Sequence, residues 1–253
     1  MTDTQIRPAK PAASHGVSIP ALAGLSLLRP ALLLLALGAV SLTLRTLGVA
    51  HAATWGPLSL NVAIVGVDVV TLLVVVRLLA RDGQSLRGVI GRFRGADVAW
   101  GLLIALGLMI VLLAVTYAGN LLMYGGAPPR PAGGEGFRVP VWFGLWATLL
   151  MPVTIAFAEE VLFRGYLQPR WSARLGSLAG LVVTAVFFGL QHVVFAWGNP
   201  QAAVVRFAAT FAGGLLLGLL ARKFGRLWPL IIGHWLADVV GLGLPLLFAA
   251  VAA

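Results

Sequence analysis

The sequence contains no cysteine and few charged side chains. With 0 cysteines among 253 residues, the chain can form neither a disulfide framework nor a thiolate metal site or nucleophile. Asp, Glu, Lys and Arg make up only 10% of the residues and hydrophobic residues 60%, against about a quarter and roughly half in soluble domains. A water-soluble core is therefore excluded, and the composition indicates a polytopic membrane protein.

Apolar stretches long enough to cross a hydrocarbon core roughly 30 Å thick as helix recur along the whole chain. We therefore expect an all-α, polytopic transmembrane helix bundle with seven spans. They are predicted near residues 30–49, 58–79, 97–123, 146–171, 178–197, 202–221 and 227–248. Gly241, Gly243 and Pro245 could break the last span, which leaves an eighth short or re-entrant piece open.

The first apolar stretch has a second interpretation as a signal peptide, because Ala-His-Ala at 50–52 resembles a small-x-small cleavage site. Its apolar region is longer than the ~7 to 15 residues typical of such signals, so we favour an uncleaved helix. The chain then divides into a cytoplasmic tail with the entry to the first span (1–29), N-terminal transmembrane helices with a Gly- and Pro-rich loop (30–139), and a C-terminal transmembrane core (140–253).

The net charge of +10 comes from basic residues at the ends of the apolar stretches. They form neither one cluster nor a pattern interleaved with aromatic residues, so nucleic acid is not an expected partner. The loops after the second, fourth and sixth predicted spans hold most of them. They are Arg77, Arg81, Arg87, Arg92, Arg94, Arg170, Arg174, Arg222, Lys223 and Arg226. By the positive-inside rule these loops and the N-terminus are cytoplasmic, and seven spans place the C-terminus outside, in a plasma membrane.

Six acidic or histidine side chains remain at predicted membrane depth, where a charge is costly unless something compensates it. They are Asp68, Glu159, Glu160, His192, His234 and Asp238. All but Asp68 belong to the last four predicted spans. Asp68 matches no motif, and we expect it to pair with another polar group inside the bundle, although proton or ion passage stays open as its role.

Helical spacing relates the two neighbouring glutamates to their surroundings. Glu160 and Arg164 are four residues apart in the order that favours an ion pair, which we expect to be structural. Glu159 points about 100° away and has no partner on its own helix; a carboxylate so placed is a better general base near neutral pH than a solvated one. If the fourth span extends to Trp171, Glu159 lies near mid-membrane at ~1.5 Å per residue, although Pro169 favours a kink.

Two further motifs lie on later helices. His192 follows Phe188 by one helical turn, and His234 and Asp238 share a helix face. Phe188 is expected to pack in the core and to shape a cavity. Together with Glu159, the two histidines and Asp238 are expected to converge in the bundle interior, in a cavity that opens towards the cytoplasm.

The three motifs, Glu-Glu-x-x-x-Arg from Glu159, Phe-x-x-x-His from Phe188 and His-x-x-x-Asp from His234, resemble those of the CPBP family of CAAX prenyl endopeptidases and bacteriocin-processing or Abi proteins. The resemblance covers roughly residues 145–245 and makes 140–253 a catalytic core. It implies intramembrane proteolysis, in which the first Glu and the middle His activate a water and the last His with an Asn or Asp stabilises the oxyanion. The implied catalytic residues are Glu159, His192, His234 and Asp238, supported by Glu160, Arg164 and Phe188.

Asp238 stands where many members of the family it resembles have Asn. An ionised Asp accepts hydrogen bonds and cannot donate one to an oxyanion, so three roles stay open: fixing the tautomer of His234, donating while protonated, or ligating a metal. A divalent metal such as zinc, if present, is expected on Glu159, His192, His234 and Asp238. The name metalloprotease is common in the family, yet the spacing here is not the His-Glu-x-x-His of the zincins, so no cofactor is assigned.

We expect an intramembrane endopeptidase that hydrolyses a peptide bond of a membrane-associated protein or peptide with a water activated by glutamate and histidine. Its expected partners are that substrate and the lipid bilayer, and nothing in the chain indicates a prenyl-specific pocket. Two alternatives stay open. One is a proton-coupled transporter, against which the lack of an inverted repeat speaks, and the other is a non-proteolytic immunity or scaffold protein with the same fold.

Overall fold

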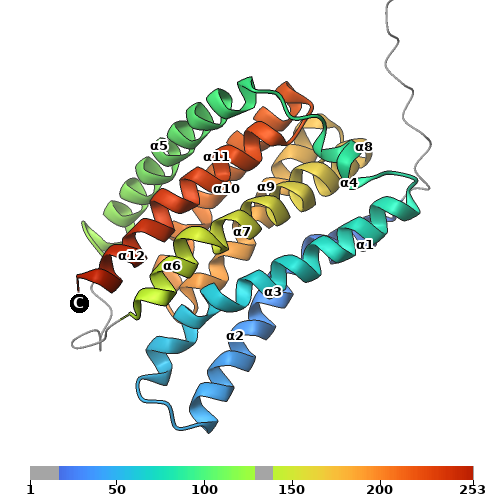
Figure 1. Cartoon of the computed structure of the whole chain (residues 1–253). Helices are drawn as coiled ribbons and strands as arrows, with labels where there is room; N and C mark the ends of the chain where they lie inside the picture. The colour runs from blue at the N-terminus through green and yellow to red at the C-terminus, as the bar shows by residue number, and fades with distance from the viewer. Residues whose placement is uncertain (1–16, 129–138, 253) are drawn as a thin grey trace, which may run out of the picture.

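Hydrocarbon offers no hydrogen bonds to the peptide backbone, so a chain of this hydropathy must satisfy its backbone groups inside helices. The computed structural model describes residues 17–128 and 139–252, which contain helices and no strand (Figure 1). Seven stretches of these residues are long and apolar enough to cross a membrane. They are Ile19–Thr46, Thr54–Arg81, Ala96–Tyr124, Val141–Leu175, Ser177–Ala196, Pro200–Phe224 and Trp228–Val251. The predicted all-α bundle of seven spans is confirmed for the described part of the chain.

The individual helices subdivide these spans. The first three spans and their connections contain α1 (Ile19–Ser26), α2 (Leu28–Thr46), α3 (Ala52–Arg81), α4 (Leu86–Ile90) and α5 (Ala96–Tyr124). The last four contain α6 (Val141–Leu149), α7 (Met151–Glu159), η1 (Glu160–Leu167), α8 (Gln168–Leu175), α9 (Ser177–Val193), η2 (Val194–Ala196), α10 (Pro200–Phe224), α11 (Trp228–Asp238), η3 (Val239–Gly243) and α12 (Leu244–Val251). The segments η1 and η3 are π-helical. The Gly- and Pro-rich loop falls mainly on 129–138, outside the described residues.

The first span begins earlier than predicted. α1 starts at Ile19, where the side chain of Ser18 accepts a hydrogen bond from the N–H of Ala21 at 3.4 Å, and α1 meets α2 at Leu27. The predicted start of the span near residue 30 is therefore too late, because the stretch long and apolar enough to cross a membrane begins at Ile19. Arg29 interrupts the apolar stretch here, but its charge is compensated inside the bundle.

The last span continues through the residues that left an eighth piece open. The chain passes from α11 through η3 into α12 without leaving helical conformation, and the described residues contain no eighth span. A Cβ on Gly243 would lie 2.8 Å from the carbonyl oxygen of Ala147. The glycine therefore permits close packing of η3 on α6 and does not end the helix.

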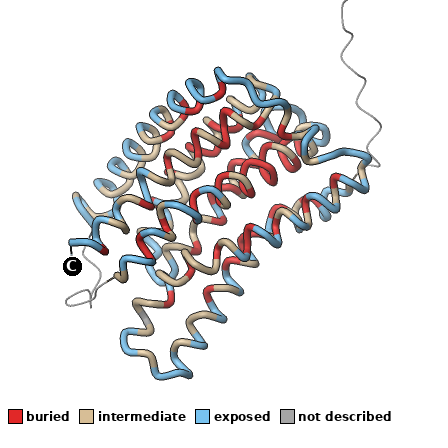
Figure 2. Tube along the Cα trace, viewed as in Figure 1, coloured by how far each residue is buried: buried red, intermediate tan, exposed pale blue. Residues whose placement is uncertain are grey.

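The fourth span forms the middle of the bundle. Its segment α7 packs against α3 and α11, and η1 contacts α3, α4, α9 and α10. Buried residues gather along α7 and η1 (Figure 2). The predicted extension beyond the glutamates is confirmed, since the span runs on to Leu175. Pro169 stands in the first turn of α8, where the missing N–H costs little, and the wide π-helical turns of η1 precede it.

Candidate functional site

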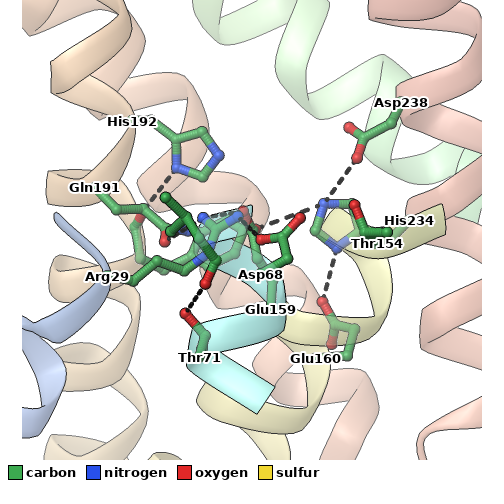
Figure 3. A network of polar contacts seen from close by, with 12 residues as sticks. Arg29, Asp68, Thr71, Thr154, Glu159, Glu160, Gln191, His192, His234 and Asp238 are labelled. Atoms are coloured by element: carbon green, nitrogen blue, oxygen red, sulfur yellow. Dashed lines mark hydrogen bonds and ion pairs between the residues drawn. The ribbon is translucent and has the colours of Figure 1, made fainter. Parts of the chain in front are cut away.

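The carboxylate of Glu159 lies inside the bundle with its two oxygens in different surroundings (Figure 3). Oε1 accepts a hydrogen bond from Nη1 of Arg29 at 2.6 Å. Oε2 has no hydrogen-bond partner among the described residues and lies 3.8 Å from Nε2 of His234. One oxygen is therefore held by a cation, and the other faces an imidazole.

Arg29, on α2, is fully buried and holds three partners at once. Besides Glu159, its Nη1 donates to Oε1 of Gln191 at 2.8 Å, and its Nη2 donates to Oδ1 of Asp68 at 2.6 Å. The expected pairing of Asp68 with a polar group inside the bundle is thus confirmed. Because a buried charge is tolerated when it is paired and hydrogen-bonded, these contacts explain an arginine in the middle of the first span.

The second glutamate forms the ion pair that its spacing predicted. Oε1 of Glu160 accepts hydrogen bonds from Nη1 of Arg164 at 3.1 Å and from Nδ1 of His234 at 2.9 Å. The guanidinium carbon of Arg164 also lies 4.1 Å from the ring centre of Phe188, and Nη2 donates to the carbonyl of Gly214 at 3.3 Å. The pair therefore joins η1 to α9, α10 and α11.

The ring of His234 lies among three carboxylates. With Nδ1 donating to Glu160, its Nε2 lies 3.6 Å from Oδ2 of Asp238 and 3.8 Å from Oε2 of Glu159. Both distances exceed that of a hydrogen bond. A neutral ring would point the lone pair of Nε2 at two carboxylate oxygens, whereas an imidazolium would point an N–H at them. Three carboxylates around one ring make the imidazolium the form with favourable charge interactions.

The other imidazole, His192, has its tautomer fixed by the backbone. Its Nδ1 lies 2.7 Å from the carbonyl oxygen of Phe188. Since a carbonyl oxygen only accepts, Nδ1 carries the proton and Nε2 of the neutral ring keeps a lone pair. The ring of Phe188 lies near both imidazoles, with centroids 4.9 Å from His192 and 6.1 Å from His234. No ion-pair contact joins His192 to Glu159 in the part of the chain that is described.

The structure thus brings together most of the predicted site. Glu159, His234 and Asp238 adjoin one another, with Glu160 and Arg164 beside them, and His192 lies on the α9 side of the same network (Figure 3). Phe188 is buried in the core as expected. The expectation that Glu159 lacks a partner holds only on its own helix, because Arg29 reaches it from α2.

Two residues of the network were missed by sequence reasoning. Arg29 was the one charged side chain between Ile19 and Leu44, and its isolation in an apolar stretch was the available signal. Gln191 directly precedes His192 and is fully buried. An amide beside a motif histidine gave no comparable signal, because glutamine carries no charge that must be compensated.

The predicted metal ligands do not form a metal site in this arrangement. Within residues 17–128 and 139–252, no group of three or more His, Asp and Glu side chains is placed to hold a metal ion. Oε1 of Glu159 is occupied by the guanidinium of Arg29, a cation itself, and Oε1 of Glu160 by Arg164 and His234. A zinc ion needs several donors gathered on one centre. Oε2 of Glu159 and Oδ2 of Asp238 have no hydrogen-bond partner among the described residues, but the predicted set is not gathered in that way.

Fold and site together define a polytopic α-helical membrane protein with a buried cluster of carboxylates, imidazoles and guanidinium groups. Residues 140–240 match the family model of type II CAAX prenyl endopeptidases, Rce1-like. This confirms the resemblance predicted for roughly 145–245, and the matched segment holds all three motifs. The match implies a CAAX-type protease, and thus a hydrolase; it gives no support to the Abi or metalloprotease assignments.

Comparisons with curated proteins and with solved structures find no match. The family match and the geometry of the site therefore carry the functional argument.

Proposed function

We propose that the protein is an intramembrane endopeptidase that hydrolyses a peptide bond of a membrane-associated protein or peptide. The observation that carries the proposal is the approach of Oε2 of Glu159 to Nε2 of His234, 3.8 Å apart, on two helices of the segment that matches CAAX-type endopeptidases. Both groups are buried. Charges in such surroundings act on a reacting centre more strongly than they would in water.

In this proposal His192 and Glu159 activate the attacking water. Nε2 of His192 keeps a lone pair and accepts one proton from the water, while Oε2 of Glu159 accepts the second hydrogen bond and orients it. Groups that share one water need not touch each other, in keeping with the lack of direct contact between them. The negative carboxylate also compensates the charge that His192 gains.

His234 is proposed to stabilise the oxyanion. As water adds to the peptide carbonyl, negative charge develops on the carbonyl oxygen, and the Nε2–H of the imidazolium donates to it. When the tetrahedral intermediate collapses, the C–N bond breaks and His192 returns its proton to the leaving amine. Asp238, one turn from His234 and 3.6 Å from its Nε2, steadies the ring between turnovers.

Cleavage by the purified protein in lipid nanodiscs tests this function. The substrates are a farnesylated peptide with a C-terminal CAAX-type sequence, the same peptide without the farnesyl group, and an unrelated transmembrane peptide, and mass spectrometry identifies the products. Glu159→Gln and His192→Asn are expected to lower the rate at least about 100-fold. Arg45→Lys, at an exposed position, is the control that retains it.

Equal cleavage by wild type and both variants would overturn the enzyme assignment. Peptide flux across the bilayer without cleavage would favour the carrier, and binding with neither would favour the immunity or scaffold protein. Preference between the first two peptides decides whether the substrate class includes a prenyl group.

The orientation in the membrane is a separate part of the proposal. We place the N-terminus and the arginine-rich loop after α3 in the cytoplasm, and the C-terminus outside, in a plasma membrane. Because the chain has no native cysteine, single cysteines at the exposed positions Gln84 and Ala127 report the two sides. An impermeant thiol reagent added to intact cells should label Ala127→Cys and not Gln84→Cys; the reverse pattern would invert the topology.

A further inference from the structure

A cation from the first span fixes the geometry of the proposed site from outside the segment that matches the family. Arg29 lies far from residues 140–240 in sequence, yet its Nη1 is 2.6 Å from Oε1 of Glu159. The contact is between a fully buried arginine and a glutamate that is 1% exposed. Solvent screens a buried ion pair little, so the contact with Arg29 strongly constrains the orientation of the Glu159 carboxylate.

The guanidinium is itself held in one orientation by two other helices. Oδ1 of Asp68 on α3 accepts from Nη2 at 2.6 Å, and Oε1 of Gln191 on α9 accepts from Nη1 at 2.8 Å. A planar guanidinium with acceptors on both terminal nitrogens cannot rotate without losing a hydrogen bond. The position of Nη1, and with it that of Oε1 of Glu159, is therefore set by α2, α3 and α9 together (Figure 3).

The consequence falls on the second oxygen of Glu159. With Oε1 occupied, Oε2 is left without a hydrogen-bond partner within the described residues and turned towards Nε2 of His234. An unpartnered carboxylate oxygen in a buried site is costly, and in the proposed function it is the oxygen that binds the water. The charge of Arg29 also keeps Glu159 ionised, because a buried carboxylate that lost its cation would take up a proton.

We infer that Arg29 is a positioning residue for Glu159: held by Asp68 and Gln191, it keeps Glu159 as a carboxylate and turns Oε2 towards His234. The inference rests on the proposed function for its effect on catalysis. It extends the functional unit beyond the matched segment, since the first two spans then supply part of the site as well as an anchor.

Steady-state kinetics with the peptide that wild type cleaves test the effect on catalysis. Arg29→Lys keeps the charge but lacks the rigid planar fork that reaches acceptors from two nitrogens. Asp68→Asn weakens the hold on Nη2, and Gln191→Leu removes one of the two acceptors on Nη1. Each is expected to lower kcat by about 10- to 100-fold with KM changed less than about twofold, because positioning of the water acts on the chemical step. Thr184→Val is the matched control, a buried polar residue of α9 whose one side-chain hydrogen bond within the described residues goes to the carbonyl of Gly180.

A spectroscopic measurement tests the carboxylate without any substrate. The infrared difference spectrum between wild type and Glu159→Gln should show the loss of an ionised carboxylate band. The difference spectrum between Arg29→Met and the double variant Arg29→Met, Glu159→Gln should instead show the loss of the band of a protonated carboxyl group. If Arg29→Met does not fold, Asp68→Asn and Gln191→Leu still decide the matter by kinetics.

The outcomes separate the two proposals. Wild-type kcat in Arg29→Lys, Asp68→Asn and Gln191→Leu would overturn the positioning role and leave the peptidase standing. If these three variants lose folding yield and kcat to the same extent, and Thr184→Val loses as much, the network has a structural role alone and the inference is overturned. If wild type cleaves nothing, the peptidase fails, and the infrared bands alone confirm or refute the hold of Arg29 on Glu159.

Discussion

Nη1 of Arg29 and Oε1 of Glu159 lie 2.6 Å apart, although 130 positions separate the two residues in the sequence. The second acidic residue, Glu160, has its own guanidinium in Arg164. Adjacent glutamates are thus neutralised by two different arginines, one on a distant span and one on the same span. This separation keeps two carboxylates in one buried site without leaving either charge uncompensated.

Replacing one member of the Glu160–Arg164 pair is predicted to destabilise the protein more than replacing both members together. Arg164→Met leaves the buried carboxylate of Glu160 with His234 as its one remaining partner among the described residues, and should cost about 3 to 5 kcal/mol of unfolding free energy. The double variant Glu160→Gln, Arg164→Met should recover part of that loss. Denaturation in mixed micelles measures both. Additive effects of the two single substitutions would contradict the coupling.

The contrast between the two glutamates also shows which contacts of the site can be predicted from the sequence. Residues on one helix have a spacing that can be calculated, so Glu160 with Arg164, and His234 with Asp238, followed from counting positions. Which helices are neighbours is decided by packing of the whole bundle, so the approach of Arg29 to Glu159 could not be predicted by counting positions. A hydropathy scale does not reveal the partner of Arg29 either, because it counts an arginine only as an unfavourable contribution to membrane insertion.

The fold was predictable for a related reason. Hydrocarbon requires long apolar helices, and seven of them could be located from composition alone. The start at Ile19 was missed because Arg29 breaks the apolar stretch, and the compensation of its charge by Asp68 and Glu159 is visible only in three dimensions. The π-helical turns of η1 were equally out of reach, since the sequence from Glu160 to Leu167 resembles any other helical segment.

Close packing of α5 on α11 is predicted to be necessary for the placement of His234. A Cβ on Gly233 would lie 2.6 Å from Cγ2 of Ile104 and 3.0 Å from the carbonyl oxygen of Gly101. Gly233→Ala should therefore push the helices apart and cost about 1 to 3 kcal/mol, with a loss of cleavage. Gly66→Ala is the control, because nothing lies within 4 Å of its added Cβ; thermal unfolding should show it at or above wild-type stability.

Chelation is predicted to leave cleavage unchanged. Oε1 of Glu159 is held by the guanidinium of Arg29, and within the described residues no three His, Asp or Glu side chains are gathered on one centre, so we expect removal of divalent ions to leave the rate of the purified protein unaltered. The measurement compares rates after treatment with a strong chelator and after restoration of zinc. A loss on chelation that zinc reverses would show that the donors rearrange around a metal in the working enzyme.

Asp238 offers the sharpest test of the proposed oxyanion site. Its Oδ2 lies 3.6 Å from Nε2 of His234 and has no hydrogen-bond partner in the described residues. Asp238→Asn keeps one acceptor for the imidazole and adds an N–H that can donate to the developing oxyanion. We therefore expect cleavage by this variant to stay within about tenfold of wild type, whereas Asp238→Leu, which can neither accept nor donate, should lose about 100-fold or more. The comparison is made on kcat, with KM measured alongside to separate chemistry from binding. If Asn fails as badly as Leu, the negative charge itself is needed to hold His234 as an imidazolium, and the carboxylate acts through that ring and not on the substrate.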